Sequence, residues 1–369
     1  MKVFGDNKTY HTQRKIFLDG DVGMQRYEQV KYSQFDILTE QQLGFFWRPQ
    51  EIDLSKDSKD FKDLTDHEKH IFTSNLKRQI ILDSVQGRAP ISTFGCITSL
   101  PEVESWITAW TFSEMIHSKS YTHIIRNVYP NPTEVFDQIM DIEDIVDCAE
   151  DISRYYDKLS EYNLKKHLLS VGQLAPIDYS EYQHKKYIWL ALHSVNALEG
   201  VRFFVSFACA WAFAENGKMA GNAEIIKMIC RDENLHLSST QKLLDLLPKD
   251  DEDFIKIKEE TLPEVLEIWE RVITQEKDWA DFLFKDGSMI GLNANILKEY
   301  VEFIAQRRMK MIGLESQYNI KSNPLPWTIE WISGKSVQTA PQELEQTEYI
   351  VGGIRQDIQE DTFDGFSLT

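Results

Sequence analysis

Two copies of the pattern Glu-x-x-His restrict how this chain can fold more strongly than any other feature of its sequence. The copies are Glu114 with His117 and Glu233 with His236. Positions i and i+3 of a helix lie on one face, so each pair projects a carboxylate and an imidazole together. One copy alone is more often a surface pair. Two copies on separate helices, with one carboxylate from each of two other helices, form the ligand set of di-iron helical bundles. The sequence therefore predicts a bundle with a buried metal centre.

Helical periodicity covers most of the chain, because apolar residues recur at intervals of three and four. The expected helices span residues 25–47, 66–88, 102–128, 133–145, 146–170, 180–215, 220–246, 252–283 and 292–313. The helical pattern ends after Pro324 and Pro326, and the sequence has no convincing strand pattern and no internal repeat. Long helices joined by short loops indicate an all-α bundle.

The last part of the chain differs in composition from the rest. From Gly334 onward it is mostly polar, and it ends in DIQEDTFDGFSLT. Such a composition buries too little apolar surface to fold alone. We therefore expect one helical domain over residues 1–333 and a flexible C-terminal tail over residues 334–369.

The charge balance excludes several classes of partner. The chain has 59 acidic and 40 basic residues, a net charge of −19, which argues against a broad surface for nucleic acid or anionic membranes. The most apolar stretch, from Phe203 to Ala214, is too short to cross a bilayer and is expected as a buried helix. The four cysteines form no CxxC pair and the N-terminus has no secretory signal pattern, so we expect a cytoplasmic protein.

Two further carboxylates complete the expected ligand set. Asp83 lies between apolar residues in QIILDSVQG, and Glu199 directly precedes the most apolar run. Buried carboxylates are costly unless they are paired or bound to a metal. An ion pair with Arg202 is an alternative for Glu199, whereas the cations nearest to Asp83 in sequence lie on other helix faces. Carboxylates with one imidazole per metal suit iron or manganese.

Tyr121 follows His117 by one helical turn and Glu114 by two turns, so the three side chains share a face. This spacing places the phenol close enough to the expected metals to be oxidised by them. Spacing alone supports equally well a core tyrosine that is bonded to some buried acceptor.

Three apolar residues are expected to line the interior beside the metals. Phe203 and Phe207 follow Glu199 at helical spacing, and Ile229 precedes Glu233 by one turn. Such a lining would shield a phenoxyl radical from water and reductants, although a phenylalanine stripe is usually only core. It favours Tyr121 as a radical site modestly.

Several segments together resemble the class Ia ribonucleotide reductase small (beta) subunit, a ferritin-like di-iron family. They are FFWRP (45–49), DSVQGRAP (83–90), the segment 110–127, SVNALE (194–199), RDENLHL (231–237) and QEKDWADFLFKDGSMIGLN (275–293). The likeness extends from about residue 22 into the C-terminal tail. The first 20 residues and the last ten match only loosely.

The resemblance implies a ferritin-like bundle with additional helices, a homodimer, and the activity of a ribonucleoside-diphosphate reductase linked to thioredoxin or glutaredoxin. It implies two oxygen-bridged iron ions, with manganese possible, and a stable tyrosyl radical on Tyr121. The radical would pass to the large (alpha) subunit, which reduces ribonucleotides to deoxyribonucleotides. The tail would dock on that subunit, folding as it binds.

The resemblance also assigns roles residue by residue. The implied metal ligands are Asp83, Glu114, His117, Glu199, Glu233 and His236. Trp47 matches the transfer tryptophan, and Asp232 matches the aspartate that links it to a metal-bound histidine. Tyr349 matches the tail tyrosine at the subunit boundary. From the residues alone, Trp47 is an ordinary core anchor and Tyr349 has no assignable role.

Three alternatives use the same observations. A ferritin-like di-iron oxygenase or desaturase would need a channel for an external substrate and would have no use for Tyr349. An iron-storage bundle is usually much shorter than 369 residues. In a purely structural helical bundle the paired motifs would be accidental.

Overall fold

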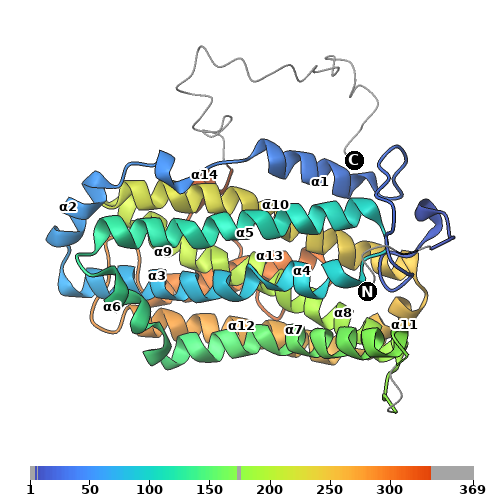
Figure 1. The fold of residues 1–369 in the computed structure, drawn as a ribbon. Helices are drawn as coiled ribbons and strands as arrows, with labels where there is room; N and C mark the ends of the chain where they lie inside the picture. Colours follow the sequence, from blue (N-terminus) through green and yellow to red (C-terminus); the bar gives the residue numbers. More distant parts are fainter. Residues whose placement is uncertain (1–4, 6, 173–175, 334–369) are drawn as a thin grey trace, which may run out of the picture.

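The computed structural model describes residues 5, 7–172 and 176–333, and this part of the chain forms a layered bundle of helices that run roughly along one direction (Figure 1). The first helices are α1 (Ser33–Gly44), α2 (Ser55–Asp63), α3 (Asp66–Gln86), α4 (Ala89–Thr93), α5 (Pro101–Val128), α6 (Pro132–Asp137) and α7 (Glu143–Ser170). They are followed by α8 (Glu181–Ala197), α9 (Phe203–Glu215), α10 (Ala220–Asp250), α11 (Asp253–Glu260), α12 (Leu262–Leu283), α13 (Ala294–Met311) and α14 (Thr328–Ser333). Outside helices and turns, the described residues contain two isolated β-bridges. The expected all-α fold is confirmed.

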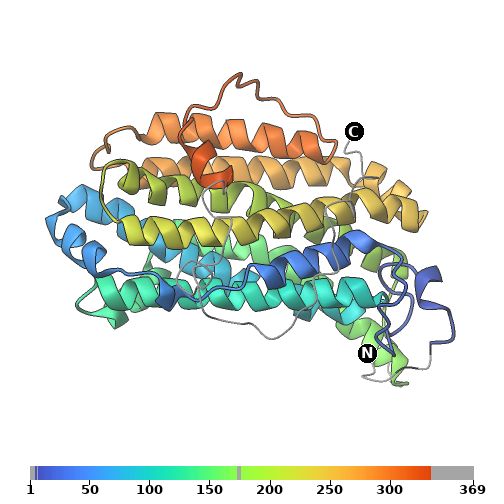
Figure 2. The ribbon, with the colours of Figure 1, turned by 90° about the horizontal axis from the view of Figure 1, so that it is seen from above.

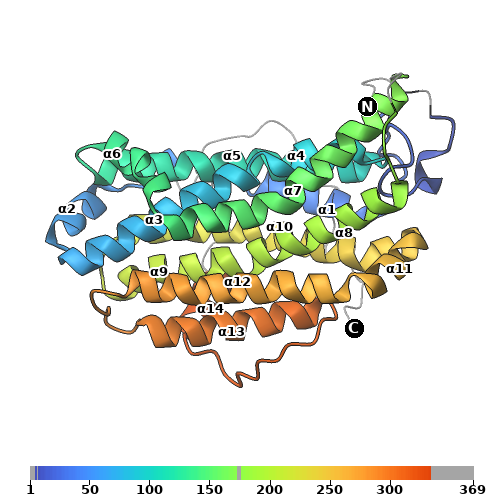
Figure 3. The ribbon, with the colours of Figure 1, turned by 90° about the horizontal axis from the view of Figure 1, so that it is seen from below.

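The core lies between two outer layers of helices. Seen from above, α10 runs between α5 on one side and α12 with α13 on the other (Figure 2). From below, α7 and α8 lie next to each other (Figure 3). The segment Glu181–Glu215, which contains α8 and α9, is long and apolar enough to cross a membrane, yet 94% of its most apolar window is buried inside the protein. This segment is the central helix of the core.

The N-terminal part is less helical than its apolar periodicity predicts. A helix was expected from residue 25, but α1 begins at Ser33. The buried carboxylate of Glu102 accepts the backbone N–H groups of Lys31 and Tyr32, each at 3.0 Å. These bonds to a side chain replace the i to i−4 bonds that would extend the helix.

Helix α2 is absent from the sequence prediction because SKDSKDFKD has almost no apolar residues to show a period. Helix α2 is held in place because one of its side chains caps the start of α10. The carboxylate of Asp57 accepts the backbone N–H groups of Gly221 at 3.0 Å and Asn222 at 2.6 Å. It thereby satisfies two of the free donors at the start of α10.

The helix ends near prolines also differ from expectation. Helix α10 passes Pro248 and ends at Asp250, since a proline in the last turn removes a single backbone bond. The prediction that helical structure ends after Pro326 was wrong. Helix α14 follows it, where the ring of Trp331 stacks on Trp211 at 5.7 Å and its Nε1 donates to Glu215 at 2.9 Å.

A buried ion network connects α3, α7 and α12 to the central helix. Glu276 is fully buried and accepts from Arg78 and from Arg202, the latter at 3.2 Å. Arg202 also donates to Asp151 at 3.0 Å and to Gln275 at 2.6 Å. These carboxylates balance two guanidinium groups that are each 1% exposed.

Replacing Glu276 by alanine is expected to lower the free energy of unfolding by about 3–5 kcal/mol, because two buried cations lose their shared partner. Urea denaturation followed by circular dichroism measures this change. Asp245→Ala, which removes the exposed partner of Lys249, is the control and should leave stability nearly unchanged. Equal stability of the two variants would contradict the role assigned to the network.

Candidate metal centre

Two sets of four side chains lie close enough together to hold one metal ion each. The first set is Asp83, Glu114, His117 and Glu233, and the second is Glu114, Glu199, Glu233 and His236. Within each set the potential ligand atoms lie within 4.8 Å of one another. The sets share Glu114 and Glu233, so each of these two carboxylates could serve both ions. All six side chains are fully buried.

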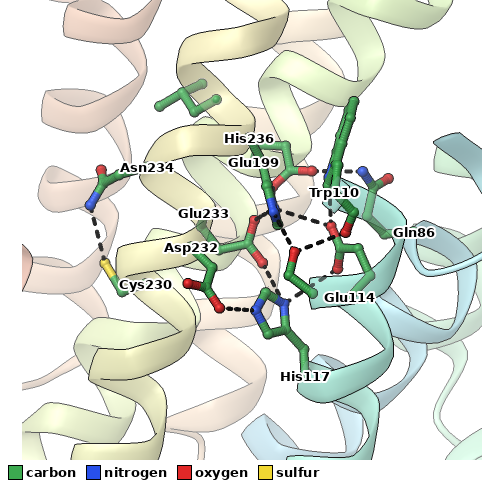
Figure 4. A network of polar contacts seen from close by, with 12 residues as sticks. Gln86, Trp110, Glu114, His117, Glu199, Cys230, Asp232, Glu233, Asn234 and His236 are labelled. Carbon is green, nitrogen blue, oxygen red and sulfur yellow. Dashed lines mark hydrogen bonds and ion pairs between the residues drawn. The ribbon is translucent and has the colours of Figure 1, made fainter. Parts of the chain in front are cut away.

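Each group comes from a different part of the core. Asp83 lies on α3, the first Glu-x-x-His pair lies on α5, and the second pair lies on α10, facing the first (Figure 4). Glu199 lies in a π-helical turn, Leu198–Arg202, between α8 and α9. Such turns are frequent at functional sites because the extra residue re-aims a side chain. Here the turn contains the carboxylate that completes the second set.

The alternative role of Glu199, an ion pair with Arg202, is not found in the described structure. Arg202 binds Asp151 and Glu276, and in the described residues it forms no ion pair with Glu199. Gly87 directly follows the end of α3. A Cβ atom there would lie 2.8 Å from the carbonyl oxygen of Asp83 on the same helix, so a larger residue would strain the end of α3, whereas Cβ of Glu114 would lie at an ordinary contact distance of 3.6 Å.

Both imidazoles have the same orientation. Nδ1 of His117 lies 3.1 Å from Glu233 and 3.4 Å from Glu114. Nδ1 of His236 lies 2.9 Å from Glu233 and 3.2 Å from Glu114. Thus Nδ1 faces the carboxylates in each ring, and Nε2 is left for an outer partner.

The outer partners fix the two rings. Nε2 of His117 lies 3.1 Å from Oδ2 of Asp232, and Nε2 of His236 lies 2.8 Å from the hydroxyl of Ser113. Metal-bound histidines usually have such a partner on the second nitrogen, which sets the tautomer and the ring orientation. The arrangement presents both Nδ1 atoms to a metal ion.

The four buried carboxylates of the centre would be stabilised by bound cations. Burial, with the neighbouring carboxylate charges, raises the pKa of Asp83 and of Glu199 well above their usual values. Although burial opposes it, the charge of Glu233 raises the pKa of His236 to about 9. Both oxygens of Asp83 and one oxygen each of Glu114, Glu199 and Glu233 have no hydrogen-bond partner in the described protein. Two hard dications would satisfy these oxygens, so the residues present fit a metal pair.

Tyr121 lies on α5 with the first pair and is fully buried. Its hydroxyl has no hydrogen-bond partner within the described residues. Burial, and then the negative charge of Asp83, raises the pKa of the phenol well above its usual value. The ring is therefore a protonated phenol beside the Asp83 carboxylate, in a place without water-facing surface.

Trp47 is connected to the centre by hydrogen bonds. Its Nε1 donates to Oδ2 of Asp232 at 2.9 Å, and the same oxygen lies 3.1 Å from Nε2 of His117. The indole is 1% exposed and lies just beyond the end of α1. Arg231 holds this loop by donating to the carbonyl of Phe45 at 2.5 Å. An unbroken polar contact therefore runs from Trp47 to the imidazole of His117.

The structure says less about the other residues predicted to have a role, which are three apolar residues and Tyr349. Phe203, Phe207 and Ile229 are all fully buried, and the two phenylalanine rings stack with centroids 5.8 Å apart. Their role as a lining for a radical stays a prediction. Tyr349 and the tail 334–369 lie outside the described residues.

The structure adds three residues that the sequence analysis missed. Trp110 donates to Glu114 at 2.8 Å, and Gln86 donates to Glu199 at 2.6 Å and accepts from the hydroxyl of Tyr156 at 2.7 Å. Helical spacing could have found two of them, because Gln86 is three positions after Asp83 and Trp110 is four before Glu114. No local signal in the sequence points to Tyr156.

Known proteins resemble this chain in sequence. The profile of the family described as "Ribonucleotide reductase, small chain" matches residues 25–324. The "Ribonucleoside-diphosphate reductase subunit beta" of Buchnera aphidicola subsp. Baizongia pistaciae (strain Bp) is 48% identical over 372 residues. The "Ribonucleoside-diphosphate reductase 1 subunit beta" of Escherichia coli O157:H7 is 47% identical over 372 residues. Both comparisons cover 99% of this chain and 99% of the relative.

Solved structures share the fold at lower sequence identity. The ribonucleotide reductase R2 subunit from Clostridium botulinum superposes with a TM-score of 0.77 at 24% identity, covering 90% of this chain and 98% of that one. Dimanganese(II)-NrdF from Streptococcus sanguinis gives a TM-score of 0.64 at 19% identity, covering 83% and 98%. These likenesses establish the bundle architecture.

Proposed function

Because this chain belongs to the ribonucleotide reductase small-chain family, we propose that its buried centre holds two iron ions and stores an oxidising equivalent as a radical on Tyr121. It is a ribonucleoside-diphosphate reductase beta subunit by sequence, and it pairs with a large subunit. One observation carries the proposal about the centre. Two four-ligand sets share Glu114 and Glu233, and Tyr121 lies on the same helix as one of them.

The ligand roles follow from the two sets. Asp83 and His117 would bind one ion, Glu199 and His236 the other, and Glu114 and Glu233 would bind both. The carboxylate-rich set suits iron and would accept manganese as well. When bound, the metal pair supplies, with dioxygen as oxidant, the power to take one electron from a phenol.

The protein's own residues decide where that electron comes from. The pKa of the Tyr121 phenol is raised far above neutral by burial and by Asp83, so its proton must leave together with the electron. Asp83 lies beside the phenol, and a carboxylate oxygen that does not bind the metal would be a suitable acceptor. Complete burial then keeps water and reductants away from the oxidised ring.

The contact between Trp47 and the centre suits coupled movement of a proton and an electron. Asp232 accepts the indole N–H and can take that proton when the ring is oxidised. We propose that the hole passes from Tyr121 through Trp47 and then through Tyr349 to the large subunit. The polar tail would carry Tyr349 to this partner in the cytoplasm, and two copies of the chain would form a homodimer.

The alternative functions account for fewer of the observed features than the reductase function does. A di-iron oxygenase or desaturase, an iron-storage bundle and a structural bundle leave the Trp47 contact without a use, and the relatives are reductase subunits over 99% of their length. The reductase function is tested by combining the iron-loaded chain with its large subunit and measuring the reduction of a ribonucleoside diphosphate. Turnover that depends on both chains is expected, and a radical-containing chain without turnover would contradict the proposal.

Removing residues 349–369 is expected to abolish association with the large subunit, because the proposed docking segment and Tyr349 are lost together. Surface plasmon resonance measures the affinity. The truncated chain should keep its metals and radical, which serves as the control for folding. Unchanged affinity would count against docking through the tail.

A further inference from the structure

Helices α4 and α7 pack against each other (Figure 3). The side chains between them leave a small open cavity. Its volume is about 220 Å³. The polar residues of its lining are Arg88, Ser92, Thr93, Ser153, Tyr156, Asp157 and Ser160. The rim therefore offers hydroxyl and carboxylate oxygens to a solute from the solvent.

The inner wall of this cavity connects directly to the candidate metal centre. Tyr156 lines the cavity and is 5% exposed. Its hydroxyl donates to Oε1 of Gln86 at 2.7 Å, and Nε2 of Gln86 donates to Oε1 of Glu199 at 2.6 Å. Two hydrogen bonds thus separate the wall of the cavity from a predicted metal ligand.

The other hydrogen bonds that connect the ligand set to surrounding residues end at buried side chains. Within the described part of the chain, Asp232 leads to Trp47, which is 1% exposed, and His236 leads to Ser113, also 1% exposed. Glu114 leads to Trp110, which is fully buried. Of these hydrogen-bonded links, the one through Gln86 and Tyr156 ends at a cavity.

The geometry gives Tyr156 a fixed role as donor. Its ring packs edge-on against Phe94, with centroids 6.1 Å apart. Burial, and then the charges of Glu199 and Glu114, raises the pKa of its phenol well above the usual value, so the hydroxyl stays protonated. Its bond orients the Gln86 amide, which must then present N–H to Glu199.

We propose that this cavity is the port through which a hydrated divalent cation reaches the metal centre, and that Tyr156 and Gln86 form its inner end by positioning Glu199. The inference rests on the proposed metal-binding function. All six predicted ligands are fully buried, so an ion needs a route inward. Along this route the ion exchanges water for hydroxyl and carboxylate oxygens, which are the ligands that hard dications prefer.

The size of the cavity suits such an ion. A water molecule needs roughly 10–15 Å³ of a cavity volume measured in this way, so about 220 Å³ admits an ion with several waters. Asp157 contributes a negative charge at the rim. Arg88 contributes a positive charge to the same lining, and its Nε donates to the carbonyl of Ser84 at 2.9 Å.

Filling the mouth should slow loading without changing the amount bound. Ser160→Trp changes an exposed rim residue, and Ser153→Trp is a second variant at a half-buried position of the rim. Stopped-flow absorption of Co(II) added to the metal-free full-length chain measures the rate. We expect the rate to fall by about tenfold because entry then requires movement of the rim, with the same final stoichiometry. Loading of both variants at the unmodified rate would overturn the port.

Tyr156→Phe tests the inner end of the port. It keeps the ring and removes the donor to Gln86, so Co(II) affinity at the ion held by Glu199 should weaken by about tenfold. Tyr155→Phe is the matched control, because the hydroxyl of Tyr155 accepts from Arg271 at 3.2 Å and, within the described residues, forms no hydrogen bond to the centre. Equal affinity of the Tyr156 and Tyr155 variants would overturn the positioning role.

The unmodified chain separates this inference from the function on which it rests. If it binds fewer than two Co(II) ions at saturation, the proposed metal pair fails. If it binds two and the rim variants load as fast as it does, the metal pair stands and the port fails.

Discussion

Tyr121→Phe is expected to remove the organic radical completely while leaving both metal ions in place. The phenol lies on α5 beside the ligand set, and its oxygen has no hydrogen-bond partner in the described protein. Phenylalanine keeps the packed ring, yet it removes the only proton that the ring could release to Asp83 on oxidation. EPR spectroscopy after addition of Fe(II) and dioxygen measures the radical, and metal analysis measures the ions.

The companion control is Tyr300→Phe. Tyr300 is also fully buried with a hydroxyl that lacks a hydrogen-bond partner in the described structure, but it lies on α13, a helix that contributes no residue to either ligand set. It should keep the full radical signal. A radical of normal yield in the Tyr121 variant would show that the radical resides on another residue.

Trp47→Phe is expected to keep the metals and the radical but to reduce nucleotide reduction with the large subunit to background. Phenylalanine fills most of the indole's space but offers Asp232 no N–H group, and it is much harder to oxidise. Asp232→Asn should have a similar effect on turnover, because it removes the proton acceptor shared by Trp47 and His117. Activity assays on variants of matched radical content measure both.

Trp269→Phe is the control for this series. Trp269 is fully buried on α12, and its indole nitrogen has no hydrogen-bond partner in the described part of the chain. It should retain turnover. Full activity of the Trp47 variant would show that the hydrogen-bonded contact is structural and that the radical leaves by another route.

Much of the fold and of the centre could be predicted because both depend on helical spacing. Apolar residues at intervals of three and four predicted long helices such as α3, α5 and α10 to within a few residues at most ends. The same spacing predicted that the two Glu-x-x-His pairs, Asp83 and Glu199 would point inward, and the structure brings all six side chains together. These are local consequences of periodicity.

What could not be predicted depends on contacts between distant segments. Helix α2 is held by capping of α10 through Asp57, and Glu102 keeps residues 31–32 out of a helix. The π-helical turn at Glu199 has no signature in composition. Tyr156 reaches the centre from another helix through Gln86, so spacing within one helix cannot reveal it.

We propose that the two ligand sets hold a metal pair that oxidises a tyrosine. This can be tested by EPR of the unmodified chain, loaded with Fe(II), exposed to dioxygen and containing tyrosine deuterated at the β carbon. We expect two iron ions per chain and an organic radical whose hyperfine pattern narrows with the deuterium label. Two bound iron ions with no radical, or a radical whose pattern ignores the label, would contradict it.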